Sequence, residues 1–148
     1  GRSWVATDRK AEVTWRGDLK SGSGRVDSVT SGALGGLDVS WAARSEEPDG
    51  KTSPEELIAA AHATCFSMAF SGGLAKEGHA PEELKTSATV TFQPGEGITK
   101  IALDVAGRVP GMDEAAFKQA AEQAKVNCPV SKALAGVPEI SLTARLQG

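Results

Sequence analysis

Apolar side chains recur at every second position in three short runs over the first third of the chain. The apolar positions of these runs are Val13 and Trp15, then Val26 and Val29, then Leu37, Val39 and Trp41. Alternation at period two is typical of strands that have one covered face. The pattern predicts three short strands, followed by a polar loop over residues 44–51.

The strongest helix-start signal is the segment SPEE at residues 53–56. Ser is a favoured N-cap, Pro fits the first helical position, and the second Glu completes a capping box. Residues 57–70 are apolar on nearly every side, and Gly72-Gly73 or Gly78 can end the helix. A helix that is apolar all round belongs at the centre of a fold.

The second half of the chain predicts a hairpin, two helices and a last strand. Alternating segments at residues 85–93 and 98–109 are joined by a Pro-Gly-Glu-Gly turn. Asp113 can cap a helix that runs to about residue 126, and Cys128-Pro129 opens a short third helix. The last strand places Ile140, Leu142 and Leu146 at period two. The order βββ, α, ββ, αα, β is typical of an α+β fold.

Composition indicates one globular domain over residues 1–148, since about 40% of the residues are apolar and 24% are charged. A chain of this length can bury one core without disulfide staples. Residues 1–5 do not join the pattern that follows, and we interpret them as an appended remnant. We expect no apolar run long enough to cross a bilayer and see no signal-peptide core, so the expected location is cytoplasmic, without membrane contact.

Charge and ligand spacing narrow the possible partners. The chain has 16 basic and 19 acidic residues and no block of like charge, which argues against nucleic acid as a partner. Two Cys and two His could supply four metal ligands, but no pair has the spacing of a zinc site, so we expect no metal. Two cysteines without a secretion signal indicate redox chemistry rather than a structural disulfide.

The two cysteines differ in their expected surroundings. Cys65 lies twelve residues beyond the predicted cap Ser53, inside an apolar helix. Burial there raises the pKa of a thiol and leaves it inert unless a cation stabilises the thiolate, so alone it reads as a packed core residue. Cys128 precedes Pro129 at a helix start, where unpaired backbone N–H groups favour negative charge. Together the two favour a reactive pair.

The run SPEELIAAAHATCFSMA at residues 53–69, with NCPVS at residues 127–131, closely resembles the osmotically inducible protein C family, a sister branch to the organic hydroperoxide resistance proteins. The likeness extends from about Ala11 to Leu146. It implies a peroxidase of oxidative or osmotic stress defence that reduces organic hydroperoxides, and hydrogen peroxide less well. Cys65 would become a sulfenic acid and Cys128 would close a disulfide with it. An external thiol or lipoyl-type dithiol would reduce that disulfide, with no bound cofactor.

The same resemblance implies an arginine, held by a glutamate, beside the first thiolate. The matching residues are Arg44 in the loop before the helix and Glu55, with Arg25 as the alternative cation. An arginine suits this role because it stays charged in an apolar pocket and its planar fork can hold a carboxylate and a thiolate together. We expect the substrate's alkyl tail to contact Phe66, Met68 and Phe70.

The resemblance also implies an interlocked homodimer, in which two antiparallel sheets wrap around central helices. Two other functions stay open. One is an acyl hydrolase that uses Cys65 and His62 as a Cys–His pair, for which Cys128 would be dispensable. The other is a non-enzymatic redox sensor or ligand-binding dimer whose cysteines respond to oxidant without turnover. Packing at the subunit interface is the other role that we expect for His62.

Overall fold

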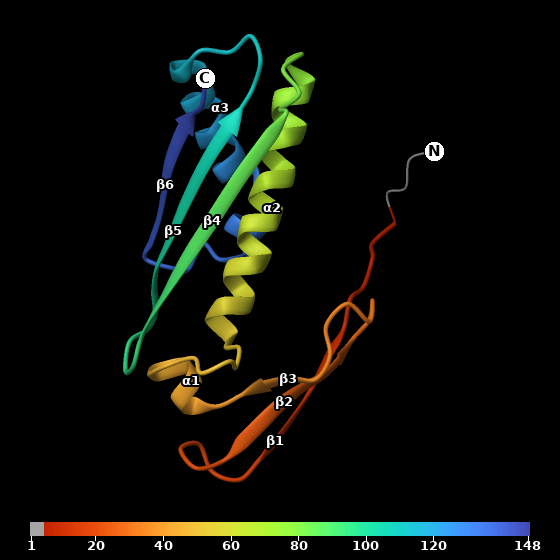
Figure 1. Cartoon of the computed structure of the whole chain (residues 1–148), viewed down its shortest axis with the longest axis vertical. Coiled ribbons are helices and arrows are strands. Elements are labelled where there is room, and N and C mark those ends of the chain that lie inside the picture. The colour runs from red at the N-terminus through yellow and green to blue at the C-terminus, as the bar shows by residue number, and fades with distance from the viewer. Residues whose placement is uncertain (1–4) are drawn as a thin grey trace. The chain divides into compact units, whose positions relative to one another are not determined.

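The computed structural model describes residues 5–148, which separate into two compact units, one ending at Pro54 and one from Glu55 to Gly148 (Figure 1). That residues 1–148 form a single domain stays a prediction. Of the predicted remnant, residues 1–4 lie outside the described residues.

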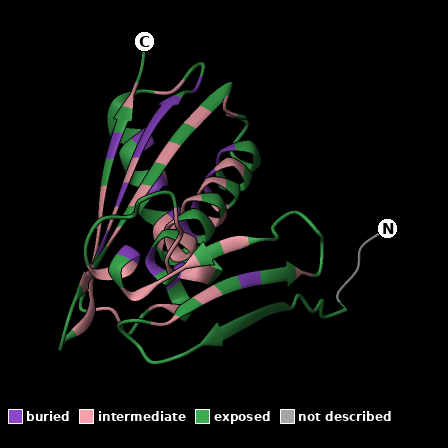
Figure 2. Ribbon diagram, turned by 60° about the horizontal axis from the view of Figure 1, so that its bottom comes forward, coloured by how far each residue is buried: buried purple, intermediate pink, exposed green. Residues whose placement is uncertain are grey.

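The first unit is built on a small antiparallel sheet. Its strands are β1 (Ala11–Arg16), β2 (Ser23–Val29) and β3 (Leu37–Val39), hydrogen-bonded in that order. The three strands confirm the alternation of the sequence. Val26 on β2 is buried, whereas all six residues of β1 are exposed (Figure 2). The sheet therefore presents an uncovered strand, including Val13 at 58% and Trp15 at 40% exposure.

A short helix follows β3 that the sequence pattern did not predict. Helix α1 spans Trp41–Ser45, and the Ser40 hydroxyl caps it by accepting a hydrogen bond from the Ala43 N–H at 3.1 Å. A serine at this position satisfies one of the free N–H groups of the first turn. Trp41 therefore belongs to a helix and not to a strand, and Arg44 lies on that helix and not in a loop.

The second unit contains a three-stranded sheet and the remaining helices. Its elements are α2 (Pro54–Lys76), β4 (Glu83–Gln93), β5 (Gly97–Arg108), α3 (Glu114–Asn127), α4 (Pro129–Ala133) and β6 (Glu139–Leu146). The predicted hairpin is confirmed as the antiparallel pair β4 and β5, and β5 is the central strand. The predicted cap of α3 is also confirmed, because the Asp113 carboxylate accepts from the Ala116 N–H at 2.8 Å.

The α+β class is confirmed, but the second sheet is mixed and not antiparallel as expected. Strand β6 pairs in parallel with β5, with Lys100 opposite Glu139 at one end and Gly107 opposite Leu146 at the other. The reason is the connection: α3 and α4 carry the chain back along the sheet before β6 begins, and such crossovers join parallel strands.

Helix α2 contributes three large side chains to the core of this unit. Phe66, Phe70 and Leu74 follow one another at four-residue intervals and are at most 1% exposed. The Phe70 ring centroid lies 5.6 Å from that of Phe66 and 5.0 Å from that of Phe117 on α3. Inward-facing residues of β5 and β6, including Leu103, complete the cluster. The packing fixes α2 and α3 on the same face of the sheet.

The end and the length of α2 differ in part from expectation. Gly78, at φ +82°, ends the helix, as one of the two predicted stops, with hydrogen bonds from the Gly78 N–H to Ala75 O and from the His79 N–H to Leu74 O. At 23 residues, α2 is long and apolar enough to span a bilayer by length and composition, contrary to our expectation. Core helices pass the same test, and the inward face of α2 is packed as just described.

The close approach of α3 to β5 depends on a missing side chain at Gly107. A Cβ there would lie 2.7 Å from the Phe117 ring and 2.9 Å from Leu84. We expect Gly107→Ala to lower the free energy of unfolding by about 1–3 kcal/mol, because the ring or the strand must shift. Chemical denaturation measures this. In the control Gly136→Ala, no atom lies within 4 Å of the added carbon; equal losses in both variants would contradict the packing argument.

Candidate functional site

The two cysteines meet inside the second unit, although 63 positions separate them in the sequence. Their thiols lie close enough for each to shift the pKa of the other, and both are free rather than joined in a disulfide. Cys128 is completely buried, whereas Cys65 is partly exposed. The pair therefore joins a partly exposed residue to a buried one.

Cys128 marks the junction of two helices. Its backbone N–H bonds Ala124 O at 2.9 Å and ends α3, and the residue is also the N-cap of α4, with Pro129 at the first helical position. Proline has no N–H, so the free donors of this turn are those of Val130 and Ser131. The Cys128 side chain makes no capping hydrogen bond, but both N–H groups lie close enough to the two sulfurs to favour a thiolate there.

The surroundings move the two pKa values in opposite directions. Burial raises the pKa of the Cys65 thiol, and the hydrogen bond to Cys128 raises it further, against the opposing effect of the Val130 N–H. Burial also acts to raise the pKa of Cys128, but the Ser131 N–H, the Cys65 thiol and the Ser131 hydroxyl outweigh it, so the pKa is lowered. The ionisation of each thiol therefore depends on that of the other.

His62 bonds to the start of α4 and not to Cys65. The side chain is fully buried, and its Nε2 lies 2.7 Å from the Ser131 Oγ. Nδ1 has no hydrogen-bond partner among residues 5–148, and burial lowers the pKa of the imidazole, which favours the neutral ring. A Cys–His hydrolase needs a bond between ring and thiol, and neither ring nitrogen makes one to Cys65 within residues 5–148. Burial inside the chain also excludes the expected role at a subunit surface.

The predicted cation and its carboxylate belong to different units. Arg44 lies on α1 of the first unit, and Glu55 lies in the first turn of α2, only 7% exposed. A carboxylate that is nearly buried requires a charged or hydrogen-bonding partner. That Arg44 is this partner and activates Cys65 stays a prediction.

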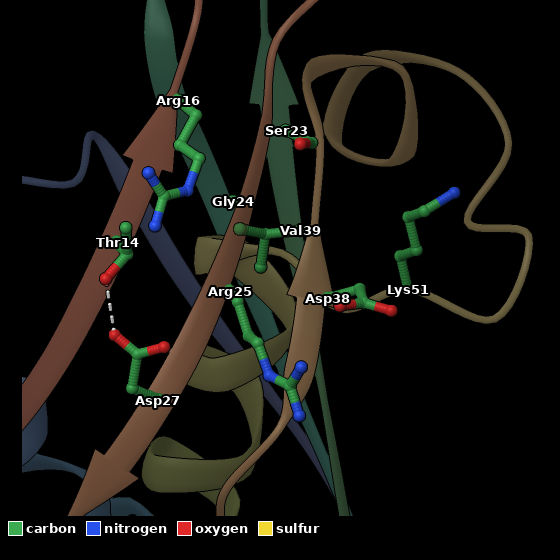
Figure 3. A pocket seen from close by; sticks show the side chains of 9 residues that line it. All are labelled: Thr14, Arg16, Ser23, Gly24, Arg25, Asp27, Asp38, Val39 and Lys51. Atoms are coloured by element: carbon green, nitrogen blue, oxygen red, sulfur yellow. Dashed lines mark hydrogen bonds between the residues drawn. The ribbon is translucent and has the colours of Figure 1, made fainter.

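The alternative cation, Arg25, lines a cavity of about 510 Å³ in the first unit (Figure 3). Its walls are polar, formed by Thr14, Arg16, Ser23, Gly24, Arg25, Asp27, Asp38, Val39 and Lys51. A Cβ at Gly36 would lie 2.7 Å from the Arg25 guanidinium, so this group packs against the backbone of its own unit. The cavity brings together three cationic and two acidic side chains.

The three residues expected to contact the alkyl tail do not form one surface. Phe66 and Phe70 are buried in the core, whereas Met68 is 70% exposed on another face of α2. The reason is helical geometry, because positions two apart lie on different faces. Met68 instead borders a cavity of about 550 Å³ between α2 and the start of β4, together with Ser67 and Leu84.

Sequence reasoning assigned no role to Val130 and Ser131, which supply the donors around the sulfurs. Their signal was present in the order Cys-Pro-Val-Ser, because a proline at the first helical position leaves the next two N–H groups free. In the part of the chain that the structure describes, no cluster of three or more His, Cys, Asp and Glu side chains is arranged to hold a metal ion. The groups that converge are two thiols with their hydrogen-bond donors, an arrangement suited to dithiol–disulfide chemistry.

Comparison with known proteins gives consistent matches. Residues 47–143 match the family described as OsmC-like protein. Peroxiredoxin OsmC of Escherichia coli is 42% identical over 142 residues, which cover 94% of this chain and 96% of that protein. The organic hydroperoxide resistance protein of Xanthomonas axonopodis pv. citri is 33% identical over 98 residues, covering 62% and 66%. A crystal structure of an organic hydroperoxide resistance protein OsmC from Legionella pneumophila shares the fold, with a TM-score of 0.64 and 19% identity over 99% of this chain and 100% of that one.

The coupled ionisation of the two thiols can be measured by following the ultraviolet absorbance of the thiolates against pH. We expect the reduced chain to ionise in two steps, one below and one above the pH at which an ordinary cysteine ionises, because the first thiolate opposes the second. Cys128→Ser should leave one step and remove the early one. Two superimposed steps at an ordinary cysteine pKa would contradict the coupling.

Proposed function

Because this chain belongs to the OsmC-like protein family, we propose that it is a cysteine-based peroxidase that reduces organic hydroperoxides to alcohols. The observation that carries the proposal is the close pair of free thiols, Cys65 partly exposed and Cys128 buried. The names of the relatives, peroxiredoxin and organic hydroperoxide resistance protein, support the same activity.

In the first step the accessible thiol attacks the peroxide. The proton of Cys65 passes to Cys128, which leaves the thiolate on the more exposed cysteine. That thiolate attacks the terminal peroxide oxygen. The O–O bond breaks as an S–O bond forms, Cys65 becomes a sulfenic acid, and the alkoxide takes up a proton and leaves as the alcohol.

In the second step the buried thiol closes a disulfide. The Cys128 thiolate attacks the Cys65 sulfur, an S–S bond forms as the S–O bond breaks, and the hydroxide released is protonated to water. The five-residue length of α4 makes it the element most easily shifted to bring the sulfurs into bonding geometry. An external thiol or lipoyl-type dithiol then restores both thiols, so the cycle needs no resident cofactor.

Arg44, held by Glu55, is proposed to lower the cost of moving the charge to Cys65. A guanidinium beside that sulfur would stabilise the thiolate against the burial that raises the pKa of Cys65. The nearly complete burial of Glu55 supports this assignment, because a buried carboxylate calls for a cation.

A homodimer in which a second chain covers exposed apolar surface is part of the same proposal. Strand β1 is exposed along its length, and Met68 is an exposed apolar side chain on α2. Apolar surface of this kind marks an interaction site in many proteins. The preference for organic hydroperoxides over hydrogen peroxide, the cytoplasmic location and the role in stress defence belong to this proposal, supported by the names of the relatives.

The order of events at the two thiols tests the activity directly. With one equivalent of cumene hydroperoxide, Cys128→Ser should consume about one peroxide per site and stop at a Cys65 sulfenic acid, while Cys65→Ser should consume none. Mass spectrometry of the unmodified chain should find a peptide linked through Cys65 and Cys128. Sustained turnover by Cys128→Ser would remove Cys128 from the second step, and no turnover by the unmodified chain with a dithiol would favour a redox sensor.

Replacement of Arg44 tests the assignment of the cation. We expect Arg44→Met to slow the reaction of Cys65 with peroxide by about tenfold for each unit by which its pKa rises above the working pH, as stopped-flow kinetics can measure. Arg44→Lys should recover only part of the rate, because an ammonium cannot hold two anions in one plane. The matched control is Arg25→Met, and a loss confined to that control would assign the cation to Arg25.

A further inference from the structure

One ring nitrogen of His62 is a buried polar atom that makes no hydrogen bond within residues 5–148. The residue lies on α2 and is 0% exposed, and its other nitrogen, Nε2, bonds the Ser131 Oγ at 2.7 Å. A buried polar atom without a partner lowers stability, so such atoms are rare and often belong to functional sites. None of the steps proposed above uses the unpartnered atom, Nδ1.

The bond to Ser131 fixes which way the imidazole ring faces. Nε2 is the ring nitrogen farther from the backbone of α2, and it is directed to the first turn of α4. Nδ1 is bonded to the ring carbon that joins the rest of the side chain, so it stays close to α2. A partner for Nδ1 must therefore come from the surface of α2 itself or from a group bound there.

Cys65 is well placed to supply that group once it is oxidised. It follows His62 by three residues, and side chains three apart on a helix are neighbours. Helical side chains lean toward the N-terminus of their helix, which directs the Cys65 sulfur over the turn that carries His62. The reduced sulfur makes no bond to Nδ1. An oxygen bonded to that sulfur reaches farther over the same turn.

We propose that His62 Nδ1 hydrogen-bonds the oxygen of the Cys65 sulfenic acid and so holds the oxidised side chain in place until Cys128 closes the disulfide. The inference deepens the proposed peroxidase and rests on it. A sulfenic acid can donate and accept a hydrogen bond, so it pairs with Nδ1 whichever ring nitrogen carries the proton. The bond ends when the oxygen leaves, and the imidazole is not consumed, so the balance of both steps is unchanged.

The two nitrogens of His62 then have separate tasks in the second step. Nε2 holds the first turn of α4 through Ser131, and Nδ1 holds the oxidised Cys65 side chain on α2. Both tasks keep the two sulfurs in position while the S–S bond forms. The first step precedes the sulfenic acid and does not use the Nδ1 bond.

Nitrogen-15 NMR of the histidine rings tests the bond directly. In Cys128→Ser, one equivalent of cumene hydroperoxide should add one oxygen to Cys65, as mass spectrometry of the whole chain can show. The Nδ1 signal of His62 should then shift, whereas the signals of the only other histidine, His79, which lies beyond the end of α2, should not. An oxygenated chain with an unchanged Nδ1 signal would overturn this inference and leave the peroxidase intact. A chain that gains no oxygen would overturn both.

Two amide replacements separate the tasks of the two ring nitrogens. In His62→Asn the amide lies near the position of Nδ1, whereas in His62→Gln it lies near that of Nε2 and can keep the bond to Ser131. In single-turnover experiments, His62→Gln should slow disulfide formation about fivefold, the usual effect of one hydrogen bond, and His62→Asn should retain more of the rate. Attack of Cys65 on peroxide should be equally fast in both variants. Equal slowing of disulfide formation, or greater slowing in His62→Asn, would overturn the proposal.

Discussion

Two sulfurs held in contact inside a protein cannot easily carry two negative charges. The proximity of the Cys65 and Cys128 thiols is the feature on which the chemistry of this site depends, because it makes their ionisation a property of the pair. Burial raises the pKa of the partly exposed Cys65, whereas hydrogen-bond donors outweigh burial at Cys128 and lower its pKa. In the proposed mechanism a proton moves from Cys65 to Cys128 before the peroxide is attacked, and the groups around each sulfur decide how readily it moves.

The fold brings the sulfurs together by placing a helix junction against the central helix. Phe66 and Phe70 pack α2 against Phe117 of α3, and α3 ends where Cys128 begins α4. The proline after Cys128 stops the first helix from continuing and leaves the next two N–H groups unpaired by the backbone. The aromatic contacts of the core thus fix the position of the α3–α4 junction, which carries Cys128 and the N–H groups that follow it.

Sequence reasoning reached the elements that depend on local signals. The proline-led start of α2, the Asp113 cap and the hairpin all follow from residues close together in the chain, and the structure contains each of them. The parallel pairing of β6 escaped prediction because it depends on the path of the intervening helices. Helix α1 was not predicted because Leu37, Val39 and Trp41 alternate as they would in a strand. The local signal for a helix was the capping residue Ser40.

The candidate site could be predicted from the sequence only in part, because it too depends on contacts between residues far apart in the chain. The motifs around the two cysteines predicted redox chemistry, which stays a prediction, whereas the contact of His62 with Ser131 joins residues 69 positions apart and has no local sequence signal. The division of charge between the sulfurs depends on burial and on N–H groups that become free only when the helix junction forms. Helical spacing likewise separated Met68 from Phe66 and Phe70, which the apolar pattern had grouped.

The central claim concerns one charge and two sulfurs, so the most direct measurement observes each sulfur separately. Carbon-13 NMR of the two cysteine Cβ atoms, followed against pH in the reduced, unmodified chain, reports the ionisation of each residue. The account predicts that the Cys128 signal moves first, at a pH below that of an ordinary cysteine, and that the Cys65 signal shows a smaller inflection at the same pH. Two independent curves, with Cys65 ionising first, would contradict it.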